Sequence, residues 1–301
     1  MGRTKFQNYA EYYSLKIMMG FLIVLGKKLS LKFASAAALF VYYFIPYRKE
    51  YVRGALKTSF PEKSDKEITK ILKNTYKNFF AVMVDIMFFP RMSDEQIKNL
   101  MVFDDKGRFE QIHKEGKGCI LLSAHFGNWE LTALSFSKRY PMSVVTGRQS
   151  NDLVDEYMMK SVRTNRGYNA IAARRDDASG LFRGVLKALK NNHFVAILSD
   201  QDAGGSGVFV PFFGRPASTP KGAALFALRA KCPIITALGV RQKDGTMQMT
   251  LQEITLPNTG NQEEDVKTIM AVYTKQLEDA VRKNPEQWFW FHRKWKTQPK
   301  S

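Results

Sequence analysis

The chain has few cysteines, a minority of acidic residues and no long uninterrupted hydrophobic run. Its 301 residues include two cysteines, Cys119 and Cys232. Two thiols cannot build a disulfide framework or a thiolate zinc site, so we expect a reducing compartment. His113 and His193 lie outside any metal-ligand spacing, and the sequence contains no HExxH segment. We therefore predict that the protein binds no metal and needs no cofactor.

Acidic residues are outnumbered by basic ones. The chain has 46 Lys and Arg against 28 Asp and Glu, which gives a formal net charge of +18. Such an excess favours anionic partners: nucleic acid, an anionic bilayer surface, or phosphorylated and acyl-carrier substrates. The bases are scattered along the chain, and no zinc-finger, RRM or basic-zipper pattern occurs, so we predict no nucleic-acid binding.

Two apolar segments near the N-terminus, 17–26 and 33–47, are too short for a comfortable membrane span of ~20 residues. No small-residue cleavage site follows them, so we expect no cleaved signal peptide. Three interpretations stay open: a helix crossing the membrane once, a pair of helices lying in the interface, or two buried helices of a soluble bundle. We favour membrane association because basic residues flank both segments. These residues are Lys27, Lys28, Lys32, Arg48, Lys49 and Arg53.

The chain changes character near residue 101. Residues 1–100 follow helical spacing, and Ser64 with Glu67 forms a capping box that begins one helix. From 101 onward, short β-rich runs alternate with helical patterns. This alternation predicts an α/β fold with a mostly parallel central sheet flanked by helices. We therefore expect an N-terminal, apolar, helical, membrane-associating region (1–100) and an α/β domain (101–301).

The predicted strands are 118–123, 142–146, 168–172, 194–199 and 234–240, and 246–254 alternates like an antiparallel edge strand. The predicted helices are 131–139, 153–166, 181–190, 222–230 and 266–282. Near the C-terminus, Trp288, Phe291, His292 and Trp295 would share one face of a helix. That helix would close the core, or present some of its rings to lipid headgroups.

The most informative segment is His125-Phe126-Gly127-Asn128-Trp129-Glu130, which lies between an apolar strand and an apolar helical run. His125 follows the carboxyl end of the strand, where open α/β sheets bind ligands. Asn128 is a suitable N-cap, which puts Glu130 in the first helical turn. Gly127 permits a sharp turn, so we expect the imidazole to fold back toward Glu130.

Contact between His125 and an ionised Glu130 would create a general base with an orienting carboxylate. The helix N-terminus favours the charged form of Glu130, which would in turn favour protonation of His125. No serine nucleophile accompanies the pair, so the proton would come from a substrate hydroxyl. The structural alternative is a hydrogen-bonded histidine in a strand-to-helix loop.

The HFGNWE segment resembles the H-x4-E element of the glycerolipid acyltransferase superfamily. Asp200-Gln201, the run VPFFGRPASTPKG (210–222) and the tail PEQWFWFHRKWK (285–296) extend the resemblance to the late lipid A acyltransferases (lauroyl/myristoyl acyltransferases). That branch also includes phosphatidylinositol-mannoside acyltransferases. The four elements agree in order and spacing over roughly residues 80–301.

The resemblance implies roles for individual residues. His125 would deprotonate the acceptor hydroxyl, with Glu130 holding and charge-balancing it. Arg148 and Arg163 match family arginines that would bind phosphate or help to stabilise the oxyanion. We also assign Gly127, Asn128, Asp200 and Gln201 to substrate binding.

The activity that the resemblance implies is transfer of a fatty acyl group from acyl carrier protein or coenzyme A to a hydroxyl of a glycolipid, without a covalent acyl-enzyme. The expected acceptor is a lipid A precursor at the cytoplasmic face of a bacterial inner membrane. A lysophospholipid or phosphatidylinositol mannoside is the alternative acceptor. A non-catalytic, basic membrane-binding protein is the alternative of another class.

Overall fold

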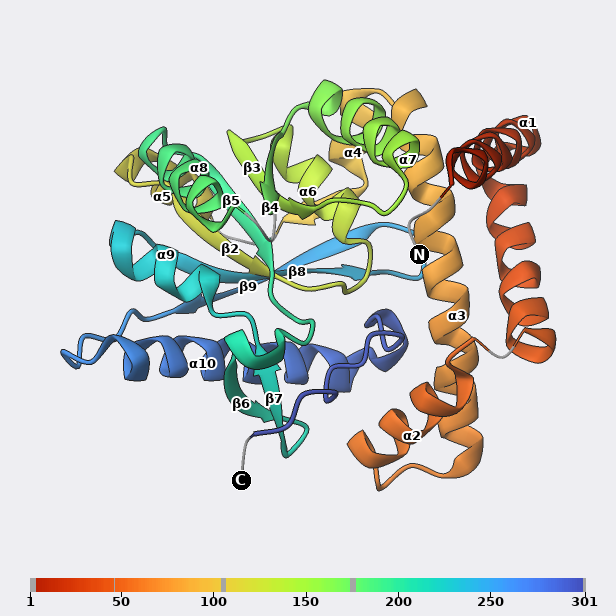
Figure 1. Cartoon of the computed structure of the whole chain (residues 1–301). Helices are drawn as coiled ribbons and strands as arrows, with labels where there is room; N and C mark the ends of the chain where they lie inside the picture. Colours follow the sequence, from red (N-terminus) through yellow and green to blue (C-terminus); the bar gives the residue numbers. More distant parts are fainter. Residues whose placement is uncertain (1–3, 46, 104–106, 174–176, 300–301) are drawn as a thin grey trace.

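A seven-stranded sheet forms the centre of the computed structural model, which describes residues 4–45, 47–103, 107–173 and 177–299 (Figure 1). The strand order is β1-β9-β8-β2-β5-β3-β4. Only the β8–β9 pairing within this sheet is antiparallel. The predicted mostly parallel α/β sheet is therefore confirmed. Its strands are β1 (Met101–Phe103), β2 (Cys119–Ser123), β3 (Met142–Gly147), β4 (Asn169–Ala173), β5 (Phe194–Leu198), β8 (Ile234–Arg241) and β9 (Met247–Ile254).

Two strand predictions need correction. β9 runs antiparallel to β8 as expected, but it is not an edge strand, because β1 pairs beside it with Met101 opposite Met247. A second, two-stranded sheet of β6 (Val208–Phe212) and β7 (Arg215–Thr219) was not predicted. β1 is three residues long, too short for an alternating pattern to be recognised.

Helices cover both faces of the large sheet (Figure 1). Successive residues of β2 point to opposite faces, as in any strand. Ile120 and Leu122 join a core cluster with α8 (Ala178–Lys190), α9 (Gly222–Ala230) and α10 (Gln262–Lys283). Cys119 and Leu121 join a cluster with α5 (Arg108–Glu115) and α6 (Trp129–Ser137). All five residues of β2 are buried, which explains the continuous apolar run that predicted it.

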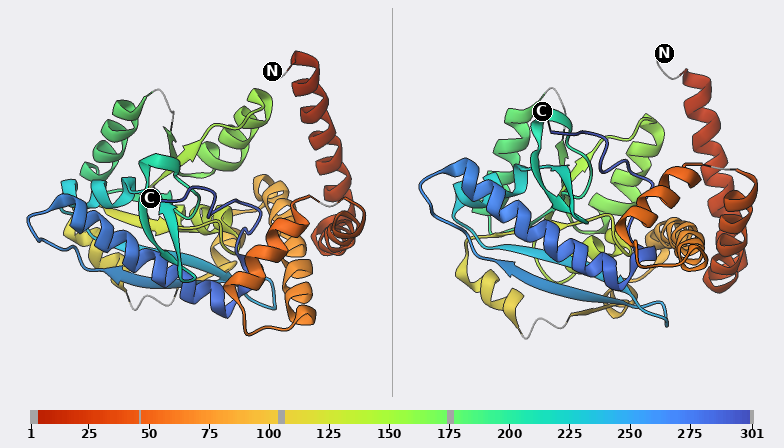
Figure 2. Two further views of the ribbon diagram at one scale, coloured as in Figure 1. Left: turned by 60° about the horizontal axis from the view of Figure 1, so that its bottom comes forward. Right: turned by 90° about the horizontal axis from the view of Figure 1, so that it is seen from below.

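The N-terminal helices α1 (Lys5–Phe44), α2 (Lys49–Ser59) and α3 (Asp65–Phe88) gather at one end of the sheet (Figure 1). α3 begins at the predicted capping box, in which Ser64 and Glu67 satisfy each other's backbone N–H groups. α1 bends at Gly26, whose φ of 75° interrupts the helix, so its two halves run in different directions (Figure 2). The short α4 (Asp94–Asn99) precedes the predicted boundary at residue 100.

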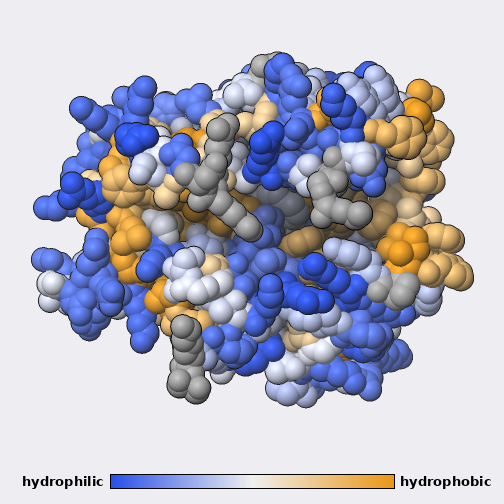
Figure 3. All heavy atoms as spheres, viewed as in Figure 1, coloured by the Kyte–Doolittle hydropathy of each residue, from blue (hydrophilic) through white to orange (hydrophobic). Residues whose placement is uncertain are grey.

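Large hydrophobic side chains are exposed mainly on and just after α1. All but three of those among the described residues lie between positions 6 and 47, with Phe6, Ile17 and Val24 exposed to 80%, 74% and 87%. Figure 3 shows hydrophobic side chains gathered at this end of the molecule. Within the described ranges, no helix combines the length and apolarity required of a membrane span.

The C-terminal segment is not the predicted helix. After a single 3-10 turn, η5 (Pro285–Gln287), the chain runs through an extended residue and a series of turns. Trp288 and Trp290 are nevertheless 2% and 1% exposed, so they close the core as one of the two interpretations held. The prediction of a helix was wrong, because the backbone at Trp288 pairs with the loop that carries His125 instead of forming helical hydrogen bonds.

Candidate active site

The loop after β2 brings His125 to the carboxyl edge of the sheet. Phe126 forms an isolated antiparallel bridge with Trp288, and the N–H of Gly127 donates to the carbonyl of Gln287 at 2.9 Å. α6 then begins at Asn128, whose side-chain oxygen accepts from the Leu131 N–H at 3.0 Å. The predicted N-cap is therefore confirmed.

Gly127 is required by its surroundings. Its φ is +57°, and a Cβ built there would lie 2.0 Å from the carbonyl oxygen of Gly239 in β8. A side chain would therefore meet both backbone strain and a backbone clash. The sharp turn that the sequence indicates at this position exists, and the His125 ring packs against Trp129 at the start of α6 but forms its ion pair with Asp200 and not with Glu130.

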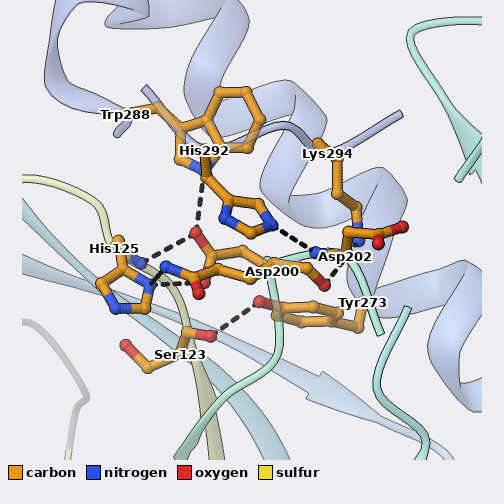
Figure 4. Close-up of polar contacts among 9 residues, drawn as sticks. Ser123, His125, Asp200, Asp202, Tyr273, Trp288, His292 and Lys294 are labelled. Atoms are coloured by element: carbon orange, nitrogen blue, oxygen red, sulfur yellow. Dashed lines mark hydrogen bonds and ion pairs between the residues drawn. The ribbon is translucent and has the colours of Figure 1, made fainter. Parts of the chain in front are cut away.

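Asp200, at the end of β5, is the carboxylate that binds His125. Its Oδ1 lies 2.9 Å from the ring Nδ1 of His125, and its Oδ2 accepts from the backbone N–H of the same residue at 3.1 Å (Figure 4). The carboxylate is 2% exposed, whereas the His125 side chain is 24% exposed. Since Asp200 occupies Nδ1, Nε2 is the nitrogen that His125 can offer to a substrate.

The environment shifts the pKa values of His125 and Asp200 in opposite directions. Burial lowers the pKa of His125, but the charge of Asp200, its hydrogen bond and the charge of Glu130 outweigh this and leave that pKa raised. Burial raises the pKa of Asp200, but the charge of His125 and the hydrogen bonds that the carboxylate accepts leave it lowered. The arrangement therefore keeps a proton on Nδ1 and makes Nε2 more basic than in an isolated imidazole.

Glu130 does not hold His125, which corrects the predicted dyad. Its carboxylate forms a salt bridge with Arg163 and accepts from the Tyr168 hydroxyl at 3.0 Å. Arg163 ends a π-helical turn, η2 (Met158–Arg163), that follows α7 (Asp152–Tyr157). Both charges are buried, with side chains 9% and 8% exposed, so they neutralise each other. Glu130 affects His125 only through its charge.

A cavity of about 650 Å³ opens beside His125. That volume is typical of small-molecule sites. Buried apolar side chains from the sheet and α6 form its inner wall, among them Leu121, Phe136, Met142 and Met249. Exposed Arg148 and Gln149 lie at its rim. α1 contributes Leu15 and Met19, so the N-terminal helix forms part of the wall.

The other predicted site residues are placed as follows. Arg163, Glu130 and Gln201 line the cavity with His125 and Arg148. Arg148 pairs with Asp152 four residues later, and both side chains are largely exposed. Asn128 is fully buried, and its amide donates to Asp85 at 3.1 Å, so the side chain shapes the loop and does not face the cavity. Gly127 likewise serves the turn.

The C-terminal segment supplies functional contacts that the sequence did not predict. Trp288 donates its indole N–H to Asp200, and His292 accepts from the backbone N–H of Asp202 at 2.8 Å (Figure 4). Lys294 is 1% exposed, and burial lowers its pKa to about 8 despite the opposing charges of Asp200 and Asp202. The dense aromatic and basic composition of 285–296 was the available signal, but it indicated no partner.

With Nδ1 held by the buried Asp200 carboxylate, His125 can use Nε2 to remove a proton from a hydroxyl. The apolar cavity beside it can hold a lipid-like chain, and its rim is basic. The chain matches the model of the bacterial lipid A biosynthesis acyltransferase family over residues 2–297 and belongs to that family. It is an acyltransferase.

Two curated relatives match most of the chain, and a third matches a smaller part of it. A lipid A biosynthesis lauroyltransferase of Escherichia coli (strain K12) is 27% identical over 264 residues, which cover 85% of this chain and 81% of the relative. A lipid A biosynthesis palmitoleoyltransferase of the same strain is 24% identical over 258 residues, with the same coverage. A phosphatidylinositol mannoside acyltransferase of Mycobacterium tuberculosis (strain CDC 1551 / Oshkosh) is 24% identical over 121 residues, 40% of this chain and 38% of the relative.

Proposed function

We propose that the protein transfers a fatty acyl group from an acyl thioester, carried by acyl carrier protein or coenzyme A, to a hydroxyl of a lipid A precursor. The observation that carries this proposal is the His125–Asp200 pair beside an apolar cavity. The relatives that match most of the chain are named for lipid A biosynthesis, whereas the phosphatidylinositol mannoside enzyme matches a smaller part, which favours lipid A over that acceptor.

The reaction needs one base and no covalent intermediate on the protein. Nε2 of His125 takes the proton of the acceptor hydroxyl as its oxygen attacks the thioester carbonyl. The tetrahedral intermediate then collapses, the C–S bond breaks, and the imidazolium returns the proton to the leaving thiolate. Asp200 keeps the Nδ1 proton in place and stabilises the imidazolium through both steps. The products are an ester and a free thiol.

The two parts of the cavity suit two parts of the substrates. Its inner wall of Leu121, Phe136, Met142 and Met249 excludes water and matches a fatty chain. Arg148 at the rim suits a phosphate of the acceptor or the carrier. Glu130 and Arg163 also line the cavity, and their buried ion pair ties the π-helical turn to α6.

A membrane surface is the proposed place of action, at the cytoplasmic face of a bacterial inner membrane. The exposed apolar side chains of α1 would enter the interface, where a lipid acceptor resides. Lys28 and Lys32, on the second half of α1, would meet anionic headgroups. Because Leu15 and Met19 of the same helix line the cavity, a docked α1 would bring the cavity close to the lipid.

An assay with purified, detergent-solubilised protein tests the proposal. Acyl-carrier and coenzyme A thioesters are offered with a lipid A precursor, a lysophospholipid or a mannosylated inositol lipid, and both acyl-lipid product and free thiol are measured. We expect lipid A precursor to be acylated, with one thiol released per ester. His125→Ala should reduce transfer by at least ~10³-fold, because Glu130, the one carboxylate among the described residues that line the cavity, is paired with Arg163.

His193→Ala is the matched control, since His193 hydrogen-bonds Ser143 and takes no part in the proposed site. It should keep near-normal transfer. If another lipid is acylated in place of the lipid A precursor, the proposed acceptor is wrong, but the proposed general-base mechanism still holds. Thiol release without ester, or transfer by His125→Ala close to the wild-type rate, would contradict the proposed function.

A further inference from the structure

We propose that Trp288 is a positioning residue for catalysis, which fixes the Asp200 carboxylate so that its other oxygen meets the ring of His125. The inference rests on the proposed function, in which the His125–Asp200 pair is the general base. The argument comes from three sets of contacts: those of the tail backbone, those of the indole, and those that anchor the tail.

The backbone of 287–289 pairs with the catalytic loop. Gln287 accepts from the Gly127 N–H at 2.9 Å, and the N–H of Phe289 donates to the carbonyl of His125 at 2.9 Å. These two bonds flank the bridge between Phe126 and Trp288. A segment distant in the sequence therefore acts as a short antiparallel strand against the loop that carries His125.

The Trp288 side chain makes the contact that matters for the base. Its Nε1–H donates to Oδ2 of Asp200 at 3.0 Å, the oxygen that also accepts from the His125 N–H (Figure 4). Oδ1 is thereby left for the imidazole. The two donors to Oδ2 fix the rotation of the Asp200 carboxylate. Oδ1 is therefore already positioned to accept a hydrogen bond from Nδ1 of His125.

Buried contacts further along the tail anchor the loop after β5. Lys294 Nζ donates to the carbonyls of Ser218 and Gln201 and to the Thr219 hydroxyl, at 2.9, 3.3 and 2.9 Å. Thr297 donates to the Asp202 carboxylate at 2.8 Å. The tail therefore holds both partners of the pair: His125 through the backbone, and the 200–202 loop through side chains.

Removing the indole N–H leaves Oδ2 of Asp200 with one donor fewer. The negative charge then concentrates on the carboxylate, and its preferred rotation is lost. The carboxylate then holds the proton on Nδ1 more strongly, so the pKa of His125 rises. At the same time, the fraction of molecules in which His125 and Asp200 are aligned falls. The expected effects are a lower kcat and an acid limb of the kcat/KM profile displaced to higher pH.

Trp288→Phe and Trp290→Phe provide a matched comparison. Trp290 lies in the same aromatic cluster and is equally buried, but its indole donates to the carbonyl of Pro285. Trp288→Phe should lower kcat by about 10–100-fold with less than ~3-fold change in KM, and displace the acid limb. Trp290→Phe should leave the limb in place. Equal losses of kcat in the two variants, or an unmoved limb in Trp288→Phe, would overturn the proposal.

A measurement without turnover makes the test independent of assay and of the fold of the variant. The chain has four histidines and four tryptophans, so the imidazole and indole signals can be assigned by single substitutions. In the wild-type protein, the signal of the Trp288 indole N–H should change with pH at the same midpoint as that of His125, because both residues hydrogen-bond to Asp200. A Trp288 indole signal insensitive to that midpoint would refute the positioning role.

The two readouts separate this inference from the proposed function. Absence of acyl transfer by the wild-type protein would refute the function and leave the titration measurable. If the wild-type protein transfers acyl groups normally but the Trp288 indole signal does not change as His125 titrates, only the positioning role is refuted.

Discussion

At the scale of single residues, the choice between Asp200 and Glu130 decides the pH dependence. The charge of Asp200 raises the pKa of His125 more than the charge of Glu130 does. A protonated ring cannot accept a proton, so wild-type activity falls as pH drops through this raised pKa. Asp200→Asn removes the main stabilising charge, lowers that pKa and should displace the acid limb of kcat/KM to lower pH.

The same substitution should reduce kcat by about 10²–10⁴-fold, because the ring loses its orienting anion. Glu130→Gln should move the limb less than Asp200→Asn does, since Glu130 acts on His125 without a hydrogen bond. pH–rate profiles of the two variants provide the measurement. A larger displacement in Glu130→Gln would restore Glu130 as the main partner of His125.

The sequence located both carboxylates but favoured the wrong one as the hydrogen-bond partner of His125. Strand-end geometry places Asp200 at the same sheet edge as His125, but the turn at Gly127 and the first helical turn favour Glu130 as the partner. What overrides proximity is Arg163, 33 residues later, which takes Glu130 into a buried pair with Tyr168. The sequence pattern around His125 and Glu130 contains no information on Arg163, which a distant π-helical turn places beside Glu130.

At the scale of elements, the β2–α6 turn depends on Gly127. Gly127→Ala combines a φ of +57° with a Cβ 2.0 Å from the Gly239 carbonyl. We expect a loss of more than ~3 kcal/mol in the free energy of unfolding, with activity lost as the loop moves. Gly116, at the end of α5, has φ +72° with nothing within 4 Å of a built Cβ. Gly116→Ala isolates the backbone term and should cost about 1 kcal/mol.

Chemical denaturation of both variants measures the difference. Equal destabilisation of Gly116→Ala and Gly127→Ala would show that the contact with Gly239 adds nothing to the strained turn.

Elements were predictable where their periodicity is local. Buried strands such as β2 and β5 and the capped helix α3 follow from apolar runs and a capping box. β1 and the β6–β7 hairpin were missed, and the tail was given a helix. The aromatic spacing of 288–295 fits a helix, but pairing with the His125 loop satisfies its backbone instead. Such non-local pairing overrides propensity.

At the scale of the whole molecule, the exposed hydrophobic side chains of α1 predict its orientation on lipid. Phe6, Ile17 and Val24 lie on one face of the first half of α1 and are highly exposed. Replacing all three by Ser should reduce binding to anionic phosphatidylglycerol vesicles by at least ~10-fold, because apolar burial drives interfacial binding. Sedimentation with vesicles measures this.

A matched triple variant tests whether position matters. Val102, Phe182 and Val272 are exposed hydrophobic residues outside α1, and their replacement by Ser should leave vesicle binding unchanged. Equal loss of binding in both triple variants would contradict an orientation set by α1.

The pairing of the tail with the His125 loop also constrains when the enzyme can first work during its own synthesis. About 160 residues separate the histidine from Trp288, and a ribosome adds ~5–20 residues per second. Asp200 is added partway through that interval, and from then on the nascent chain holds the histidine and the aspartate but lacks the strand that aligns them. Catalytic competence therefore arises late, after the chain beyond Pro285 has left the ribosome and folded back onto the loop.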